Sequence, residues 1–159
     1  MTKYCNNSKY GLKHFTDNLT ELQPEDDVAC QNKKLYNFKF HIPTKEQYEE
    51  LINYTNSYWV KNYDPNKTTH NLEDDRGIIG LNGRVFEGKN GNQLFIPAAG
   101  YYNDSSINFV GSYGFVWTSS LYIDNPDSAY LLYFHGDSMC MFDNTRCNGR
   151  SVRPVINLR

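Results

Sequence analysis

The chain of 159 residues lacks the sequence patterns of several large classes of protein. It has no apolar run long enough to cross a membrane, and residues 1–4 do not begin an apolar secretory signal. We therefore expect no membrane insertion and no signal peptide in this chain. The net charge is −2, and no cluster of Lys and Arg provides the basic surface that nucleic acids require. We expect no nucleic-acid partner.

Patterns that would mark a metal site or an active site are absent as well. The 4 cysteines and 4 histidines are scattered, without a C-x-x-C pair or the close spacing of metal ligands. No segment offers a nucleophile with a nearby base, and no glycine-rich phosphate loop is present. We expect no metal, no cofactor and no catalytic residue, so the chain is predicted not to be an enzyme. A disulfide between Cys5 and Cys30 is left open by the sequence.

A further absence is confined to the C-terminal part of the chain. Between Leu94 and Arg159 there is no Lys, Glu or Gln, whereas the first 93 residues carry 10 Lys, 7 Glu and 4 Gln. At the same frequency about 15 of these residues would be expected in this part. One explanation is β-structure, in which straight-chain polar residues are depleted. The other is genetic, because codons ending in a pyrimidine cannot encode Lys, Glu, Gln, Met or Trp. Trp117, Met139 and Met141 are then informative exceptions.

A hairpin is predicted around these two methionines. Residues 129–135 alternate in the period of a strand, and a turn at Gly136 and Asp137 leads into a second alternating segment. We predict that Met139 and Met141 point inward together with Tyr130, Leu132 and Phe134, and that Trp117 lies in the core. The opposite face is neither polar nor apolar, so we predict that it is exposed and contacts a ligand. An irregular sheet surface with a few exposed aromatic residues is the alternative. The residues of this face are Leu131, Tyr133, His135, Ser138, Cys140 and Phe142.

Two helices are predicted in the first 56 residues and strands in the later part. Pro24 followed by three acidic residues favours a first helix beginning near residues 23–30. Thr44 and Gln47 form a capping box, which predicts a second helix directly after a strand at residues 36–42. Residues 56–75 are polar and are interpreted as a long loop. From residue 77 onward the pattern is that of strands, with a hairpin around residues 88–91, which contain an Asn-Gly pair. The predicted class is α+β.

Several strings of residues are together specific for one family. In their order and spacing they resemble the C-type-lectin-fold domains related to formylglycine-generating enzymes, in particular the Fibrobacter-type paralogous domain of gut Bacteroidetes and their phages. The resemblance covers roughly residues 20–155. The strings are residues 23–29 (QPEDDVA), 42–51 (IPTKEQYEEL), 94–101 (LFIPAAGY), 113–120 (YGFVWTSS), 129–130 (AY) and 149–155 (GRSVRPV).

The resemblance implies one C-type-lectin-like domain over residues 1–159, with two helices in the N-terminal half and an antiparallel β-rich C-terminal half. One group in this family comprises the variable proteins of diversity-generating retroelements. Their variable segment is similar to a template of repeated Asn codons that has been mutated at adenines, and here it would span about residues 113–155. All the residues at the implied variable positions can be encoded by codons ending in a pyrimidine. These ligand-binding candidates are Tyr122, Leu131, Tyr133, His135, Asp137, Ser138, Cys140, Phe142, Asp143, Thr145 and Cys147.

The function implied by the resemblance is receptor recognition. A ligand-binding module would display a diversified surface toward a cell-surface macromolecule, from an extracellular position on a bacterial cell or a phage tail. The expected partner is a cell-surface protein, with a glycan as the alternative. Two other functions stay open: a surface adhesin or glycan-binding module of the same fold with a fixed site, and a degenerate formylglycine-generating-type enzyme. The catalytic cysteines of that enzyme have no clear counterpart, because Cys140 and Cys147 fall at implied variable positions.

Overall fold

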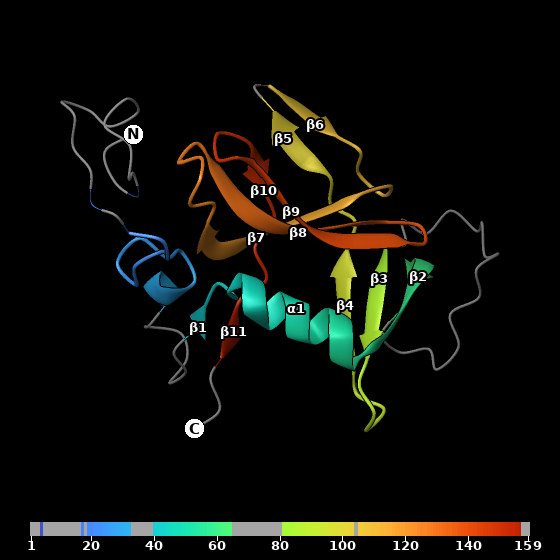
Figure 1. The fold of residues 1–159 in the computed structure, drawn as a ribbon. Helices are drawn as coiled ribbons and strands as arrows, with labels where there is room; N and C mark the ends of the chain where they lie inside the picture. The colour runs from blue at the N-terminus through green and yellow to red at the C-terminus, as the bar shows by residue number, and fades with distance from the viewer. Residues whose placement is uncertain are drawn as a thin grey trace.

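The computed structural model is dominated by short antiparallel strands (Figure 1). It describes Tyr4, Asp17 and residues 19–32, 40–64, 81–103 and 105–156. The elements in chain order are η2 (Cys30–Asn32), β1 (Phe40–His41), α1 (Lys45–Tyr54), β2 (Asn56–Tyr63), β3 (Leu81–Glu87), β4 (Gln93–Pro97), β5 (Tyr101–Asn103), β6 (Ser106–Asn108), β7 (Gly114–Leu121), β8 (Ser128–His135), β9 (Ser138–Thr145), β10 (Gly149–Arg150) and β11 (Val155–Ile156).

The strands of the described residues form three small sheets and one additional pair. The sheets have the orders β2-β3-β4, β7-β8-β9 and β10-β5-β6, and β1 pairs with β11. All of these pairings are antiparallel. In Figure 1, α1 lies beneath the β7-β8-β9 sheet, and the β5-β6 hairpin stands on the other side of that sheet. The central sheet therefore has one face toward the helix and one face toward the hairpin.

The hydrophobic core lies between α1, the β2-β3-β4 sheet and the inner face of the β7-β8-β9 sheet. Its members Leu132 and Phe134 have 0% of their surface exposed. Burying side chains of this size contributes about 2 kcal/mol each. Met139 and Met141 of β9 are partly buried and pack against the same cluster, which confirms the predicted inward direction of the two methionines. The buried members of the cluster are Tyr48, Phe86, Ile96, Ala98, Val116, Leu132 and Phe134.

The predicted second helix is confirmed as α1, together with its capping box. Thr44 is the N-cap: its side-chain oxygen accepts from the Gln47 N–H at 3.3 Å, and Gln47 Oε1 accepts from the Thr44 N–H at 3.0 Å. These two bonds satisfy amide groups that the first turn of a helix leaves without partners. Tyr48 is the buried residue of the helix. The cap therefore fixes the register in which α1 meets the core.

The predicted first helix is wrong, and so is the α+β class. Residues 23–30 form separate turns that lead into η2. The carboxylate of Asp27, which is 3% exposed, accepts from the Ala29 N–H at 2.7 Å and from the Ile42 N–H at 2.8 Å. This local side-chain bond competes with helical hydrogen bonding. Strands make up 50% of the structure and helices 10%, with one α-helix in the described part. The arrangement is not clearly that of the predicted C-type lectin fold.

Two further expectations concern the strands around the helix. The first eight residues of the predicted loop at residues 56–75 form β2, because they pair with β3 and bury Val60. Residues 65–80 lie outside the described residues, as does most of the strand predicted at residues 36–42, of which β1 is described. The hairpin around residues 88–91 is confirmed as β3 and β4, with Glu87 opposite Gln93. Gly91 has φ +80°, a conformation that favours glycine.

Candidate functional site

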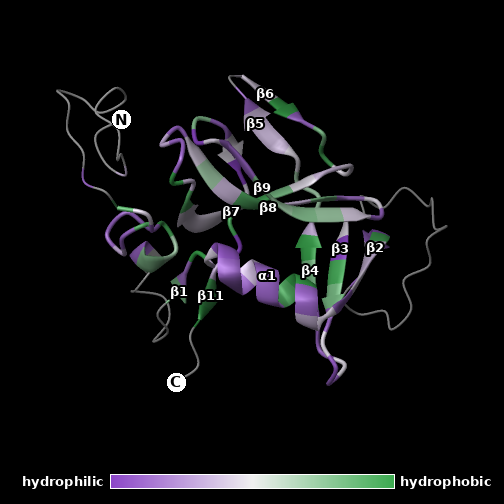
Figure 2. Ribbon diagram, viewed as in Figure 1, coloured by the Kyte–Doolittle hydropathy of each residue, from purple (hydrophilic) through white to green (hydrophobic). Residues whose placement is uncertain are grey.

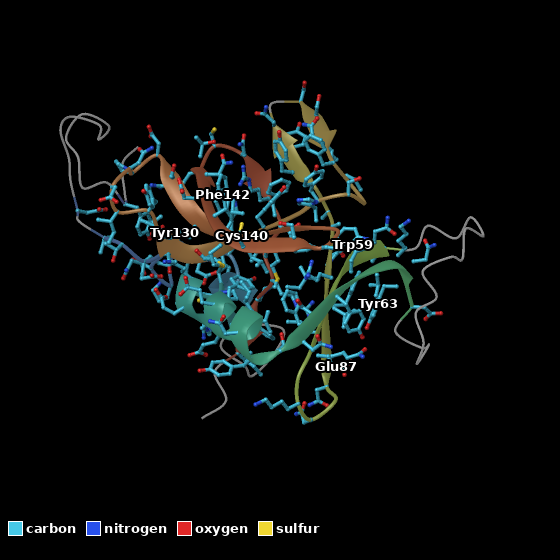
Figure 3. The ribbon with its side chains drawn as sticks, turned by 45° about the vertical axis from the view of Figure 1, so that its right-hand side comes forward. Trp59, Tyr63, Glu87, Tyr130, Cys140 and Phe142 are labelled. Carbon is cyan, nitrogen blue, oxygen red and sulfur yellow. The ribbon has the colours of Figure 1, made fainter. Side chains whose placement is uncertain are left out.

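The outer face of the β7-β8-β9 sheet brings residues from three strands together. Phe115 lies opposite Tyr133, and Tyr133 lies opposite Cys140. Because side chains alternate along a strand, these residues share a face opposite to that of Leu132 and Met141. Phe142 lies on the same outer face, and Figure 3 shows it on the side of the sheet away from α1. The two-residue turn between β8 and β9 is the one predicted from the sequence.

An open cavity of about 590 Å³ lies over this face, and we call it the aromatic cup. Its floor comes from β7, β8 and β9, and its walls come from β5, β10 and the segment before β7. Its volume lies within the range of ligand pockets, roughly 300–1,000 Å³. The residues that line the aromatic cup are Tyr101, Phe109, Tyr113, Phe115, Tyr133, Cys140, Phe142, Asn144, Asn148 and Arg150.

The rings of the aromatic cup contact one another. The Phe115 ring lies 5.2 Å from the Tyr133 ring and 5.3 Å from the Tyr101 ring, measured between centroids. Tyr113 stacks on Tyr133 at 6.0 Å, and Phe142 approaches Tyr133 at 6.3 Å. Burial, followed by the neighbouring Tyr113 and Cys140, raises the pKa of Tyr133. Tyr133 is therefore at the centre of a cluster of rings that hold one another in place.

Arg150 is a cation enclosed by these rings. Its guanidinium carbon lies 4.7 Å from the centre of the Trp117 ring, 5.2 Å from Phe115 and 5.5 Å from Tyr101. Its Nε and Nη1 are buried and have no hydrogen-bond partner among the described residues. Burial lowers the pKa of Arg150, although an arginine stays charged at neutral pH. The aromatic cup therefore holds one positive charge without a negative partner in the described part of the chain.

A second arginine, Arg84, holds the β8-β9 turn through hydrogen bonds to its backbone. Arg84 of β3 is 6% exposed, and its Nη1 donates to the carbonyl oxygen of Gly136 at 2.9 Å. The same nitrogen lies 3.5 Å from the carbonyl oxygen of Ser138, and Nε donates to Ser57 Oγ at 3.2 Å. Burial lowers the pKa of Arg84, and nearby Asp137 raises it. The tip of the hairpin is thus attached to the neighbouring sheet.

Two expectations about this face are wrong. Leu131, predicted to be exposed, has 0% exposure. It lies in the central strand between Trp117 and Phe142, so the larger side chains on both sides cover it. Trp117, predicted to lie in the core, is half-buried on the outer face, because it is directly opposite Leu131 and lies under Arg150.

The other candidate residues fall into distinct places. Tyr133, Cys140 and Phe142 line the aromatic cup, and the His135 ring lies 5.0 Å from the Tyr113 ring beside it. Tyr122 lies elsewhere, 5.4 Å from the Tyr130 ring. The negative charge of Asp124 raises the pKa of Tyr122 most, and burial and Asp143 raise it further. Asp143 lies opposite Tyr130 in the sheet. The remaining candidates are exposed in the turns before and after β9 and at its two ends: Asp137, Ser138, Thr145 and Cys147.

Several residues of the aromatic cup were not among the candidates from the sequence. Extending the alternation of β8 to β7 would have included Tyr113 and Phe115, and extending that of β9 would have included Asn144. No local pattern brings Tyr101 to Arg150. These two residues meet because β5 pairs with β10, with Arg150 opposite Tyr101.

In the described part of the chain, no three His, Cys, Asp or Glu residues come close enough to hold a metal ion. None of the helices described there is long and apolar enough to cross a membrane. Cys140 and Cys147 are exposed free thiols, while Cys5 lies outside the described residues. Comparison with protein-family models, curated proteins and solved structures finds no match. The family resemblance therefore stays a prediction from the sequence.

Proposed function

We propose that the chain is a receptor-recognition module and that the aromatic cup is the centre of its binding surface. The module would act outside the cell, on a bacterial surface or a phage tail, and would bind a cell-surface protein. One observation carries the proposal: on the β8-β9 hairpin, three of the positions implied to vary lie together on the outer face, and positions that alternate with them hold the core. Tyr133, Cys140 and Phe142 line the aromatic cup, whereas Leu132 and Phe134 are fully buried.

The composition of this surface suits recognition. Tyrosine and phenylalanine offer large, rigid contact areas at a low entropic cost, and they are frequent anchors of protein interfaces. Asn144 and Asn148 add amide groups that can donate or accept hydrogen bonds. The aromatic cup thus combines rigid anchors with adaptable polar contacts.

Diversification is the part of the proposal that rests on the family resemblance. Substitutions on the outer face would leave the inner face of the same hairpin unchanged, so the core would be preserved. Asn144 and Asn148 would be positions at which the template codon has not been mutated. Diversification predicts a near-identical repeat of this coding segment in the flanking DNA, differing mostly at adenines and lying next to a reverse transcriptase gene.

A fixed-site surface adhesin is the second candidate, and Leu131 favours it. This residue stands at an implied variable position but has 0% exposure, so its side chain is constrained by packing. A fixed site would use the aromatic cup in the same way, without diversification. The flanking DNA separates the two candidates, because an adhesin with a fixed site requires no repeat and no reverse transcriptase.

Binding itself is tested with the purified chain and a panel of intact gut bacterial isolates, using flow cytometry. We expect labelled chain to stain at least one isolate, and we expect the double variant Tyr133→Ala, Phe142→Ala to lose that staining. Tyr54→Ala is the matched control, because Tyr54 is 71% exposed at the end of α1, outside the aromatic cup. Staining that both variants retain, or that no isolate shows, would contradict the proposal.

A further inference from the structure

The charge of Arg150 has no counterpart in the aromatic cup. The lining contains no Asp or Glu, and Arg150 forms no ion pair within the described ranges. Its Nε and Nη1 are shielded from water and lack acceptors. Enclosed N–H groups of a half-buried cation that lack acceptors are unfavourable, because they lose hydration and gain no hydrogen bond in exchange. The guanidinium therefore has hydrogen-bonding capacity that the described residues do not satisfy.

The surrounding rings compensate for only part of this loss. The faces of Trp117, Phe115 and Tyr101 attract the guanidinium through their negative π-surfaces. A guanidinium also directs its N–H groups outward in its own plane, where they require oxygen acceptors. Because Nε and Nη1 are enclosed, Nη2 is the nitrogen left to meet a ligand in the cavity. A ligand that enters the aromatic cup can therefore offer its acceptor to Nη2.

We propose that the aromatic cup binds an acidic side chain of the protein partner, with its carboxylate on Arg150. The proposal rests on the proposed recognition function and deepens it by naming the chemistry that is recognised. A carboxylate supplies the negative charge and forms shorter, stronger hydrogen bonds with a guanidinium than a neutral acceptor does. The side-chain amides of Asn144 and Asn148, which also line the aromatic cup, can donate to a carboxylate oxygen.

The rim of the aromatic cup favours a protein as the source of the carboxylate. Phe109, which follows β6, is 54% exposed and lines the aromatic cup, and Val110 next to it in the chain is 63% exposed. Figure 2 shows hydrophobic colouring in the chain that follows β6. Aliphatic side chains are covered well by apolar side chains of a protein, and poorly by the hydroxyl groups of a sugar. The expected epitope is an Asp or Glu flanked by apolar residues.

The test is a selection from a random dodecapeptide phage library on immobilised chain. Three proteins are compared: the unchanged chain, Arg150→Met and Arg153→Met. The last variant is the matched control, because it removes an equal charge from an exposed residue outside the aromatic cup. We expect Asp or Glu next to apolar residues to be enriched on the unchanged chain and on Arg153→Met, and not on Arg150→Met.

A selected peptide then provides the quantitative measurement by calorimetry. Exchanging its Glu for Gln should weaken binding to the unchanged chain by about thirtyfold, the effect expected for removing one partner of an enclosed charge pair. The same exchange should change binding to Arg150→Met by less than about threefold. Because the Glu-to-Gln comparison on the unchanged chain needs no variant, a folding defect in Arg150→Met cannot hide the result.

Equal enrichment of acidic peptides on Arg150→Met would overturn the inference. So would a Glu-to-Gln exchange without effect, or binding of sialylated oligosaccharides that needs Arg150 while acidic peptides fail to bind. Peptides whose binding requires Tyr133 and Phe142, but neither an acidic residue nor Arg150, would refute carboxylate binding and would still support recognition through the aromatic cup. Peptides that depend on none of these three residues would refute both proposals.

Discussion

The guanidinium carbon of Arg150 lies 4.7 Å from the centre of the Trp117 ring. The main chain holds this arrangement, because the Trp117 N–H donates to the carbonyl oxygen of Ser151 at 3.0 Å and Val116 forms a parallel bridge with Ser151. Backbone pairing therefore positions Arg150 on both sides. Arg150 itself pairs with Tyr101 of β5, and the next residue, Ser151, pairs with β7. Its side chain is held between ring faces, and no carboxylate of the described residues pairs with it.

On the β8-β9 hairpin, removing a core side chain should lower the free energy of unfolding much more than removing a side chain of the outer face. Phe134→Ala removes a side chain with 0% exposure and should cost about 3–5 kcal/mol of the free energy of unfolding, because a cavity remains. Phe142→Ala, at 49% exposure, should cost less than about 1 kcal/mol. Chemical denaturation of both variants measures the difference. Similar losses would mean that the outer face is structural.

The close approach of Gly114 to Phe134 should make this glycine intolerant of a side chain. A Cβ at Gly114 would overlap the Phe134 ring, so Gly114→Ala should destabilise the protein by about 1–3 kcal/mol or more. Adding Phe134→Leu to this variant should cost less than it does in the unchanged chain, since the smaller residue relieves the overlap. A double-mutant cycle by denaturant unfolding gives the coupling energy. Strictly additive effects would contradict the predicted contact.

Asp27 should stabilise the turn segment through its two carboxylate oxygens. Asp27→Ala leaves the N–H groups of Ala29 and Ile42 without their acceptor, so we expect a loss of about 1–3 kcal/mol. Asp27→Asn keeps one acceptor oxygen and should lose less. Asp137→Ala is the control, because Asp137 is exposed. Thermal and denaturant unfolding of the three variants should give this order, and an unchanged stability in Asp27→Ala would refute the anchoring role.

Tyr48 should make the fold sensitive to alkaline pH. Burial raises the pKa of its hydroxyl, which has no hydrogen-bond partner among the residues described. A raised pKa in the folded state means that the stability from the neutral hydroxyl is complete below the unfolded value, about 10, and is lost as the pH rises above it. Tyr48→Phe should therefore be neutral or slightly stabilising at pH 7 and should reduce the alkaline loss. Unfolding free energies across this pH range provide the measurement, with Tyr54→Phe, 71% exposed, as control.

Binding to the true partner should depend on the aromatic anchors and not on calcium. Tyr133→Ala or Phe142→Ala should each weaken the affinity by about 2 kcal/mol or more, since buried aromatic residues often dominate an interface. EDTA should leave the affinity unchanged, because no metal-ligand cluster lies among the described residues. Surface plasmon resonance with and without EDTA tests both statements. An affinity that collapses with EDTA and survives both substitutions would place the site elsewhere.

The sequence predicted those parts of the fold that depend on neighbouring residues. The capping box of Thr44 and Gln47 and the turn at Gly136 involve residues close in the chain, so their patterns are visible locally. The prediction of a first helix was wrong because Asp27 accepts a hydrogen bond from the distant Ile42 N–H, which no local pattern reveals. The predicted exposure of Leu131 was wrong for a related reason. Alternation gives the face on which a residue lies, while its exposure depends on the side chains of neighbouring strands.

In the candidate site too, residues that follow a local pattern could be predicted, and residues brought together by distant strand pairing could not. Alternation on β8 and β9 was sufficient to find Tyr133, Cys140 and Phe142. The opposite wall of the aromatic cup depends on the pairing of β5 with β10, which joins residues 101 and 150 and could not be inferred without the structure. The cation in the aromatic cup was therefore missed, although it lies within one of the strings that carry the family resemblance.

The attachment of Arg84 to the hairpin turn has a consequence for how the chain could change over generations. Arg84 holds the tip through the carbonyl oxygens of Gly136 and Ser138, groups that every amino acid carries. New side chains at Asp137 or Ser138 would leave this anchor intact, whereas loss of Arg84 itself would release the tip. The protein can therefore exchange the chemistry it presents at the hairpin tip while the geometry of presentation is inherited unchanged.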